Sequence, residues 1–242
     1  MRTRRIMHSA LKSDREYLRG LYEAEVIQVD DAVGKLVETL KTLNIHDETL
    51  IIVTSDHGEE FFEHDNFEHG HTFYQELLHV PLVFKLPGVS RPRRVKDRVS
   101  ILNILPTILD LCSISPDPGS IPASSSLARF WEHPAGPAAS RPLVSESVLY
   151  GESGLAIVFD DMKYIRRGEA GVEALYDLAA DPAEKTSLVD HEPVRMRQAR
   201  KIHDFHDAWS RSVRKRIWRS GMRTTRHDEN VRKHLRSLGY IK

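Results

Sequence analysis

A short apolar run that ends abruptly in an acid, a histidine and a glycine constrains this chain most. Residues 50–53 are mostly β-branched, which is typical of a strand buried on both faces, as in a parallel sheet. The run leads into Ser55-Asp56-His57-Gly58. Ligands of open α/β sheets collect where strands end, and a carboxylate beside a neutral imidazole suits a metal ion. We therefore predict a metal site at Asp56 and His57, with a plain turn capped by Asp56 as the alternative.

The segments around this corner favour an α/β fold. Before it, apolar residues recur at alternating spacings of four and three, which predicts a long amphipathic helix with a core-facing stripe. The stripe consists of Tyr22, Val26, Val29, Val33, Leu36, Leu40 and Leu43. After it, residues 79–86 read as a second apolar strand and residues 102–111 as a helix. A helix followed by a buried strand is the repeating unit of α/β proteins.

The second half of the chain differs from the first in composition and in its strand patterns. Residues 113–142 are rich in Ser, Pro, Ala and Gly, which predicts a linker. Short strand patterns joined by tight polar turns then predict a small antiparallel sheet, over residues 143–148, 154–159, 162–166 and 173–178. Residues 193–212 have helical spacing. We expect two domains, a large α/β domain at 1–138 and a small α+β domain at 139–242.

Composition excludes several classes of partner and site. Basic and acidic residues number 35 each, so zero net charge offers no reason to expect nucleic acid. The single cysteine, Cys112, rules out an intrachain disulfide and a CxxC metal site. No run approaches the ~20 apolar residues of a membrane span. The basic start has no apolar run behind it, so we expect no secretory signal, and the compartment stays open.

Seven short motifs occur in order along the chain. They are Tyr22-Glu-Ala-Glu-Val, Thr54-Ser-Asp-His-Gly-Glu, Glu68-His-Gly-His-Thr-Phe-Tyr-Gln-Glu, His79-Val-Pro-Leu-Val, Ile104-Leu-Pro-Thr-Ile-Leu-Asp-Leu, Leu175-Tyr-Asp-Leu-Ala-Ala-Asp-Pro-Ala-Glu and Leu235-Arg-Ser-Leu-Gly-Tyr-Ile. In this order they resemble the C-terminal half of a sulfatase, in the alkaline phosphatase superfamily. The resemblance implies part of a mixed sheet flanked by helices, plus a small C-terminal antiparallel sheet with a helix.

The resemblance also implies an activity, which is metal-dependent hydrolysis of sulfate esters. In this family a divalent metal, often Ca²⁺, holds one oxygen of the ester, and Asp56 and His57 match two of its ligands. A formylglycine made from a Cys/Ser-x-Pro-x-Arg motif attacks the sulfur. The family commonly places a sulfate-contacting Lys where this chain has Gly70. We predict that His69 or His71, on either side of Gly70, has that catalytic role. The alternative is that both are solvated loop histidines.

The nucleophile motif is where the chain departs from the family. Cys112 lies in Cys-Ser-Ile-Ser, without the Pro and Arg. Ser90-Arg-Pro-Arg-Arg fits by spelling, but it lies downstream of the metal corner, and short motifs match by accident. We therefore expect an incomplete chain that is inactive alone. An N-terminal half or a second copy would cover the exposed sheet edge.

Two other functions remain open at this point. A phosphoryl-type hydrolase or phosphoethanolamine transferase of the same superfamily would use an unmodified Thr or Ser as nucleophile. A non-catalytic binding or assembly module would need no nucleophile at all. His64 and His79 are interpreted as structural residues in every case.

Overall fold

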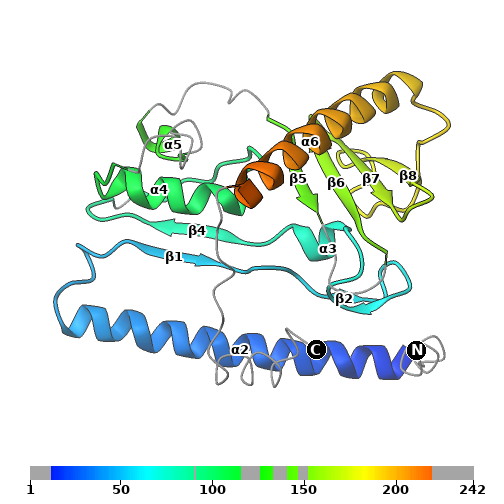
Figure 1. Ribbon diagram of the computed structural model, residues 1–242. Helices are drawn as coiled ribbons and strands as arrows, with labels where there is room; N and C mark the ends of the chain where they lie inside the picture. The colour runs from blue at the N-terminus through cyan, green and yellow to red at the C-terminus, as the bar shows by residue number, and fades with distance from the viewer. Residues whose placement is uncertain (1–11, 90, 116–125, 133–140, 147–151, 220–242) are drawn as a thin grey trace. The chain divides into compact units, whose positions relative to one another are not determined.

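The computed structural model describes residues 12–89, 91–115, 126–132, 141–146 and 152–219 (Figure 1). By its internal contacts the chain divides into two compact units, residues 1–199 and 200–242. The predicted boundary at residue 138 lies outside the described residues, so the proposed domains stay a prediction. No helix among the described residues is long and apolar enough to cross a membrane.

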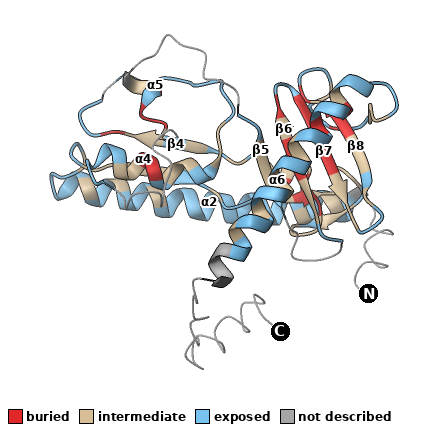
Figure 2. Cartoon of the chain, turned by 45° about the horizontal axis from the view of Figure 1, so that its top comes forward, coloured by how far each residue is buried: buried red, intermediate tan, exposed pale blue. Residues whose placement is uncertain are grey.

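The first long helix, α2, spans Lys12–Thr42 and confirms the predicted helix (Figure 1). Its apolar stripe is not core within the described part of the chain: Val29 is 63% exposed, and most of the helix is coloured as exposed in Figure 2. The expectation of a buried stripe is therefore wrong here. Helical periodicity shows which face is apolar, but it does not say what covers that face.

The predicted strand at the corner forms, but in a different environment. β1 (Ile51–Thr54) pairs antiparallel with β4 (Leu82–Lys85), with Val53 opposite Val83. Both of these valines are exposed, so the expectation of a parallel strand buried on both faces is wrong for the described residues. A short β-branched run indicates a strand, yet its partner and its cover depend on the rest of the fold.

A small hairpin and a one-turn helix follow β1. β2 (Glu60–Phe61) pairs antiparallel with β3 (Phe67–Glu68), and α3 spans Gln75–Leu78. Gly58 is required where the segment after β1 passes α3, because a Cβ there would lie 1.9 Å from the Glu76 carbonyl oxygen. The Gly58 N–H donates to the Leu77 carbonyl at 2.9 Å. This close approach fixes the Asp56-His57 corner against α3.

Part of the predicted linker is packed structure. η1 (Ile101–Asn103) continues into α4 (Ile104–Leu111), and α5 spans Arg129–Glu132. The buried Thr107 side chain of α4 accepts a hydrogen bond from the Leu127 N–H at 2.9 Å. The linker prediction is therefore wrong for residues 126–132. Residues 116–125 and 133–140 lie outside the described residues.

The predicted antiparallel sheet is confirmed. It has the order β5-β6-β7-β8 and consists of β5 (Leu143–Glu146), β6 (Gly154–Phe159), β7 (Met162–Arg167) and β8 (Val172–Asp177). Ile157, Tyr164 and Leu175 are fully buried in it. The predicted C-terminal helix is α6, Pro193–Arg219, and it begins in the first unit. Helices with antiparallel sheets confirm the predicted α/β class.

Candidate metal and catalytic site

Asp56 and His57 come together at the end of β1. His57 Nε2 lies 3.7 Å from Asp56 Oδ1, and His57 Nδ1 lies 2.8 Å from the Gly58 carbonyl oxygen. A carbonyl oxygen can only accept, so Nδ1 donates there and a neutral ring keeps its lone pair on Nε2. The Asp56 side chain is 82% exposed. Asp56 accepts from the His57 N–H at 3.0 Å and precedes a strand rather than a helix, which removes the capping alternative.

This geometry passes a simple test of fit to a metal ion. Ligating histidines nearly always donate their second ring nitrogen to a carbonyl or carboxylate, as His57 does to Gly58. The lone pair on Nε2 and the carboxylate oxygen are close enough to meet at one ion. Both groups are reachable from solvent. The assignment of Asp56 and His57 as ligands nevertheless remains a prediction.

The two candidate catalytic histidines lie in different environments. The His69 ring stacks on the His57 ring, with centroids 4.0 Å apart and planes at 27°, and the side chain is 42% exposed. His71 is only 11% exposed, and its Nε2 lies 3.5 Å from Glu60 Oε2. Its Nδ1 lies 3.1 Å from the His69 carbonyl oxygen. The structure thus brings His69 to the corner and directs His71 toward the interior.

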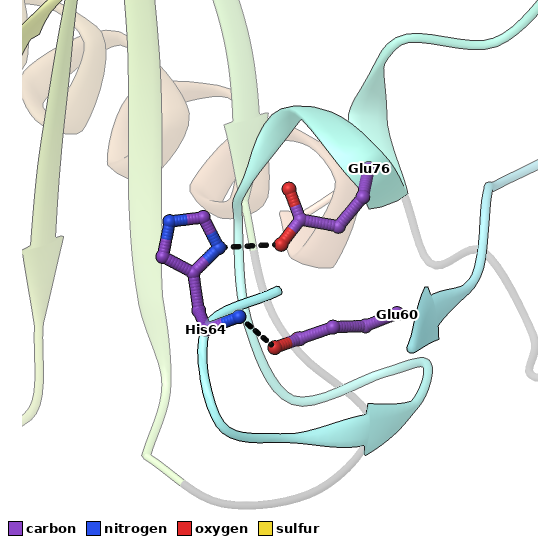
Figure 3. Close-up of side chains that lie close together, drawn as sticks. All are labelled: Glu60, His64 and Glu76. Carbon is purple, nitrogen blue, oxygen red and sulfur yellow. Dashed lines mark hydrogen bonds and ion pairs between the residues drawn. The ribbon is translucent and has the colours of Figure 1, made fainter. Parts of the chain in front are cut away.

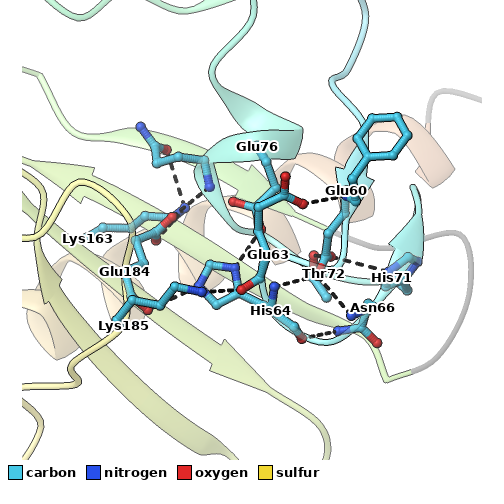
Figure 4. A network of polar contacts seen from close by, with 12 residues as sticks. Glu60, Glu63, His64, Asn66, His71, Thr72, Glu76, Lys163, Glu184 and Lys185 are labelled. Atoms are coloured by element: carbon cyan, nitrogen blue, oxygen red, sulfur yellow. Dashed lines mark hydrogen bonds and ion pairs between the residues drawn. The ribbon is translucent and has the colours of Figure 1, made fainter. Parts of the chain in front are cut away.

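Glu60 is the centre of a buried polar network behind the corner (Figure 4). Its Oε1 accepts from the backbone N–H groups of His64 at 3.1 Å and Asn66 at 3.2 Å, and its Oε2 accepts from the Thr72 hydroxyl at 3.1 Å. Burial alone would raise the pKa of Glu60. The hydrogen bonds from His71 and the other donors outweigh it, so the pKa lies below its usual value.

A second group in this network has the spacing of a metal site. Glu60, His64 and Glu76 each place a ligand atom within 4.8 Å of the others (Figure 3). These atoms already have partners, however. His64 Nδ1 lies 2.5 Å from Glu76 Oε1, and its Nε2 lies 3.1 Å from the Glu184 carbonyl oxygen. We interpret the group as a structural network, which agrees with the structural part expected for His64.

The network continues into the four-stranded sheet through a buried ion pair that sequence reasoning missed. Lys163 Nζ on β7 lies 2.8 Å from Glu184 Oε1, and both side chains are fully buried. Glu184 Oε2 also accepts from the Gln75 N–H at 2.6 Å. Burial lowers the pKa of Lys163, while the charge of Glu184 opposes that shift. A lysine within a strand pattern was a signal, but nothing local identified its partner.

Comparisons with known proteins agree with this architecture. Residues 6–114 match the family model described as Sulfatase. Arylsulfatase K of Canis lupus familiaris is 30% identical over 193 residues, covering 75% of this chain and 35% of that protein. Arylsulfatase K of Gallus gallus is 31% identical over 204 residues, covering 79% and 37%. The chain therefore spans little more than a third of the length of these curated relatives.

Solved structures show the same fold. A putative sulfatase from Bacteroides thetaiotaomicron aligns with a TM-score of 0.72 at 23% identity, over 88% of this chain and 47% of that one. The phosphonate monoester hydrolase of Agrobacterium radiobacter aligns with a TM-score of 0.69 at 28% identity, over 83% and 43%. The chain is therefore similar in sequence to sulfatases, and its fold is similar to part of a sulfatase.

Proposed function

We propose that this chain takes part in metal-dependent hydrolysis of sulfate esters, with Asp56 and His57 holding a divalent metal. The observation that carries the proposal is the 3.7 Å approach of His57 Nε2 to Asp56 Oδ1, with Nδ1 held by the Gly58 carbonyl. The matches to arylsulfatase K support the substrate class. The sulfatase family model covers the segment that contains this corner.

The chemistry assigned to each group follows from its position. A metal at this corner would draw negative charge from one ester oxygen and orient the ester for in-line attack. Asp56 supplies an anionic oxygen ligand and His57 a neutral nitrogen ligand. His69, stacked beside His57, would contact a remaining ester oxygen or protonate the leaving group. His71, held against Glu60, supports the loop from the inside.

The donor set bears on the identity of the metal. The family resemblance implies Ca²⁺, which prefers six to eight oxygen ligands. An imidazole nitrogen suits Zn²⁺ and other first-row metals better than Ca²⁺. We therefore propose a divalent metal and treat Ca²⁺, Mn²⁺ and Zn²⁺ as competing occupants to be compared directly.

The nucleophile is assigned to residues outside the described site. Cys112 is exposed and lies in Cys-Ser-Ile-Ser, and the 242 residues contain no Cys-x-Pro-x-Arg sequence. We propose that these 242 residues alone do not turn over a sulfate ester. Purified chain that hydrolyses an aryl sulfate, with activity abolished by Asp56→Ala, would overturn this part of the proposal.

Metal titration calorimetry tests the site without requiring turnover. We expect wild-type chain to bind one divalent ion, and Asp56→Ala and His57→Ala to abolish or greatly weaken binding. Asp47→Ala is the matched control, because Asp47 is an exposed Asp that also contacts a neighbouring histidine, His46, at 3.0 Å. Binding that survives Asp56→Ala unchanged would remove the basis of the proposal.

A phosphoryl-type hydrolase is the second candidate, favoured by one observation. The structural match at 28% identity is a phosphonate monoester hydrolase. The two candidates share the metal corner, so metal binding does not separate them. Thermal protection of the metal-loaded chain by inorganic sulfate, compared with phosphate, is the discriminating measurement. Stronger protection by phosphate would favour the second candidate.

A further inference from the structure

We infer that Glu59 is a positioning residue for His69, and that His69 rather than His71 serves the reacting group. The inference rests on the proposed function, because it places His69 beside the metal corner. It goes beyond the proposed function by naming Glu59 as the residue that positions His69.

The hairpin sets Glu59 opposite His69. β2 and β3 pair antiparallel with Glu60 opposite Glu68 and Phe61 opposite Phe67. Continuing this register by one residue on each strand brings Glu59 opposite His69. Directly opposed residues have Cβ atoms about 4.5–5.5 Å apart, which is within reach of a Glu and a His. The observed contact agrees, since Glu59 Oε2 lies 3.0 Å from His69 Nδ1.

The burial and contacts of the Glu59 side chain differ from those of a structural carboxylate. Its side chain is only 17% exposed, and within the described part of the chain its second oxygen, Oε1, is buried without a hydrogen-bond donor. A buried carboxylate oxygen without a donor is unfavourable and uncommon in a purely structural network. Glu60, the next residue, has donors on both oxygens. Among the residues that the structure describes, Glu59 therefore contacts the His69 ring through one oxygen and lacks the donors that Glu60 has on both.

The backbone also holds His69 in place. The residues before and after it, Glu68 and Gly70, have φ angles of 70° and 83°. This left-handed conformation is unfavourable for Glu68, whereas glycine adopts it freely. Strained non-glycine residues persist where the surrounding structure determines their conformation. The hairpin end is such a place, because the ladder from Glu60 to Glu68 stops there.

These contacts fix which atom His69 presents. The carboxylate of Glu59 accepts from Nδ1–H, so Nε2 is the nitrogen on the free edge of the ring. When the ring carries a second proton, Nε2 donates it to an ester oxygen or the leaving group, and the Glu59 carboxylate balances the charge of the ring. Stacking on His57 holds that ring against the proposed metal ligand. His71 has no such freedom, since its two nitrogens lie 3.1 Å from the His69 carbonyl and 3.5 Å from Glu60. Glu59 thus acts through His69, and it is a positioning residue rather than a catalytic one.

The direct test reads the tautomer of His69 by NMR on chain carrying isotope-labelled histidine. At about pH 8.5, where free histidine is neutral, we expect wild-type His69 to carry its proton on Nδ1. Glu59→Ala should give a mixture of tautomers, and Glu59→Gln, which keeps an acceptor oxygen, should restore the wild-type form in part. Glu68→Ala is the matched control, because Glu68 is an exposed carboxylate beside His69. The His57 and His64 signals report whether each variant is folded.

A His69 that keeps Nδ1–H in every variant would overturn the inference, as would equal effects of Glu59→Ala and Glu68→Ala. Should Glu59→Ala fail to fold, Glu59→Gln still decides, because wild-type tautomer proportions in that folded variant would show that the carboxylate is not needed. This readout needs no turnover. If the metal titration shows no binding but the tautomer effect is observed, the proposed function is contradicted while the role of Glu59 in positioning His69 is still supported.

Kinetics in any preparation of this chain that turns over a sulfate ester give a second readout. We expect Glu59→Ala to lower kcat about 10–100-fold, the usual effect of removing a partner that orients a site histidine. His69→Gln should lower kcat at least as much, and the double variant no further, because the two residues act as a unit. KM should change little. Independent, multiplicative losses from the two substitutions would contradict the inference.

Discussion

Asp56 and Glu60 are carboxylates four residues apart, yet they belong to opposite kinds of environment. Asp56 is open to solvent and has one backbone donor, whereas Glu60 is fully buried and has donors on both oxygens. We propose that this difference separates a ligand-binding corner at Asp56 from the buried support around Glu60. Buried polar groups with complete hydrogen bonding rigidify their surroundings. Exposed groups with spare lone pairs are the ones that can bind an ion.

The largest predicted effect lies at the far end of the supporting network. Glu184→Ala leaves Lys163 buried without its partner, which we expect to cost about 3–5 kcal/mol of unfolding free energy. Urea denaturation measures it. Lys163→Met combined with Glu184→Leu should recover much of the loss, since it removes both charges. The control is Glu38→Ala, at an exposed pair with Lys41, where we expect a change of about 0–1 kcal/mol. Equal losses of unfolding free energy in Glu184→Ala and Glu38→Ala would contradict the expected cost of leaving Lys163 buried without its ion-pair partner.

The second prediction concerns the open corner. Adding a divalent ion at about 100 times its Kd should raise the unfolding free energy of wild-type chain by about 2.7 kcal/mol. Asp56→Ala should leave metal-free stability within about 0.5 kcal/mol of wild type, because the side chain is exposed, and it should abolish the gain. Thermal melts with and without a chelator measure both. A large metal-free loss in Asp56→Ala would mean that the corner is structural after all.

The third prediction uses the pH dependence of the buried carboxylate. Because the folded pKa of Glu60 lies below its unfolded value near 4.5, its contribution is present above about pH 4.5 and is lost as pH falls through the folded pKa. Glu60→Gln should lower stability near neutral pH by about 1–3 kcal/mol. The variant should also lose less stability than wild type between about pH 4.5 and more acidic conditions. Parallel pH profiles for the two proteins would contradict this.

The smallest effect on stability is expected on α2. Leu36→Lys changes an exposed residue of the apolar stripe, so unfolding free energy should shift by about 0.5 kcal/mol or less. Self-association should nevertheless decrease, because an exposed apolar stripe favours contact between chains. Sedimentation velocity measures the change, with the exposed polar position Glu25→Lys as control. Self-association that is unaffected by Leu36→Lys would place the contact surface elsewhere.

Local features of the candidate site could be predicted because they depend on neighbouring residues. The strand that ends just before Asp56-His57 and the antiparallel strands of the second half both follow from short-range patterns. The Glu59–His69 contact could not be predicted, since it depends on a two-residue ladder whose register no pattern specifies. The sequence also could not predict which of His69 and His71 lies at the Asp56-His57 corner, because the residues around them are alike.

The amino-acid sequence by itself determined the element types, the sulfatase resemblance and the candidate ligands, because period, turn residues and short motifs act within a few positions. Tertiary structure decided which groups are buried and which meet. It exposed the α2 stripe, paired β1 with β4, and joined Lys163 to Glu184 across 21 positions of sequence. Burial and long-range pairing depend on the free energy of the whole packed chain. No local pattern carries that information.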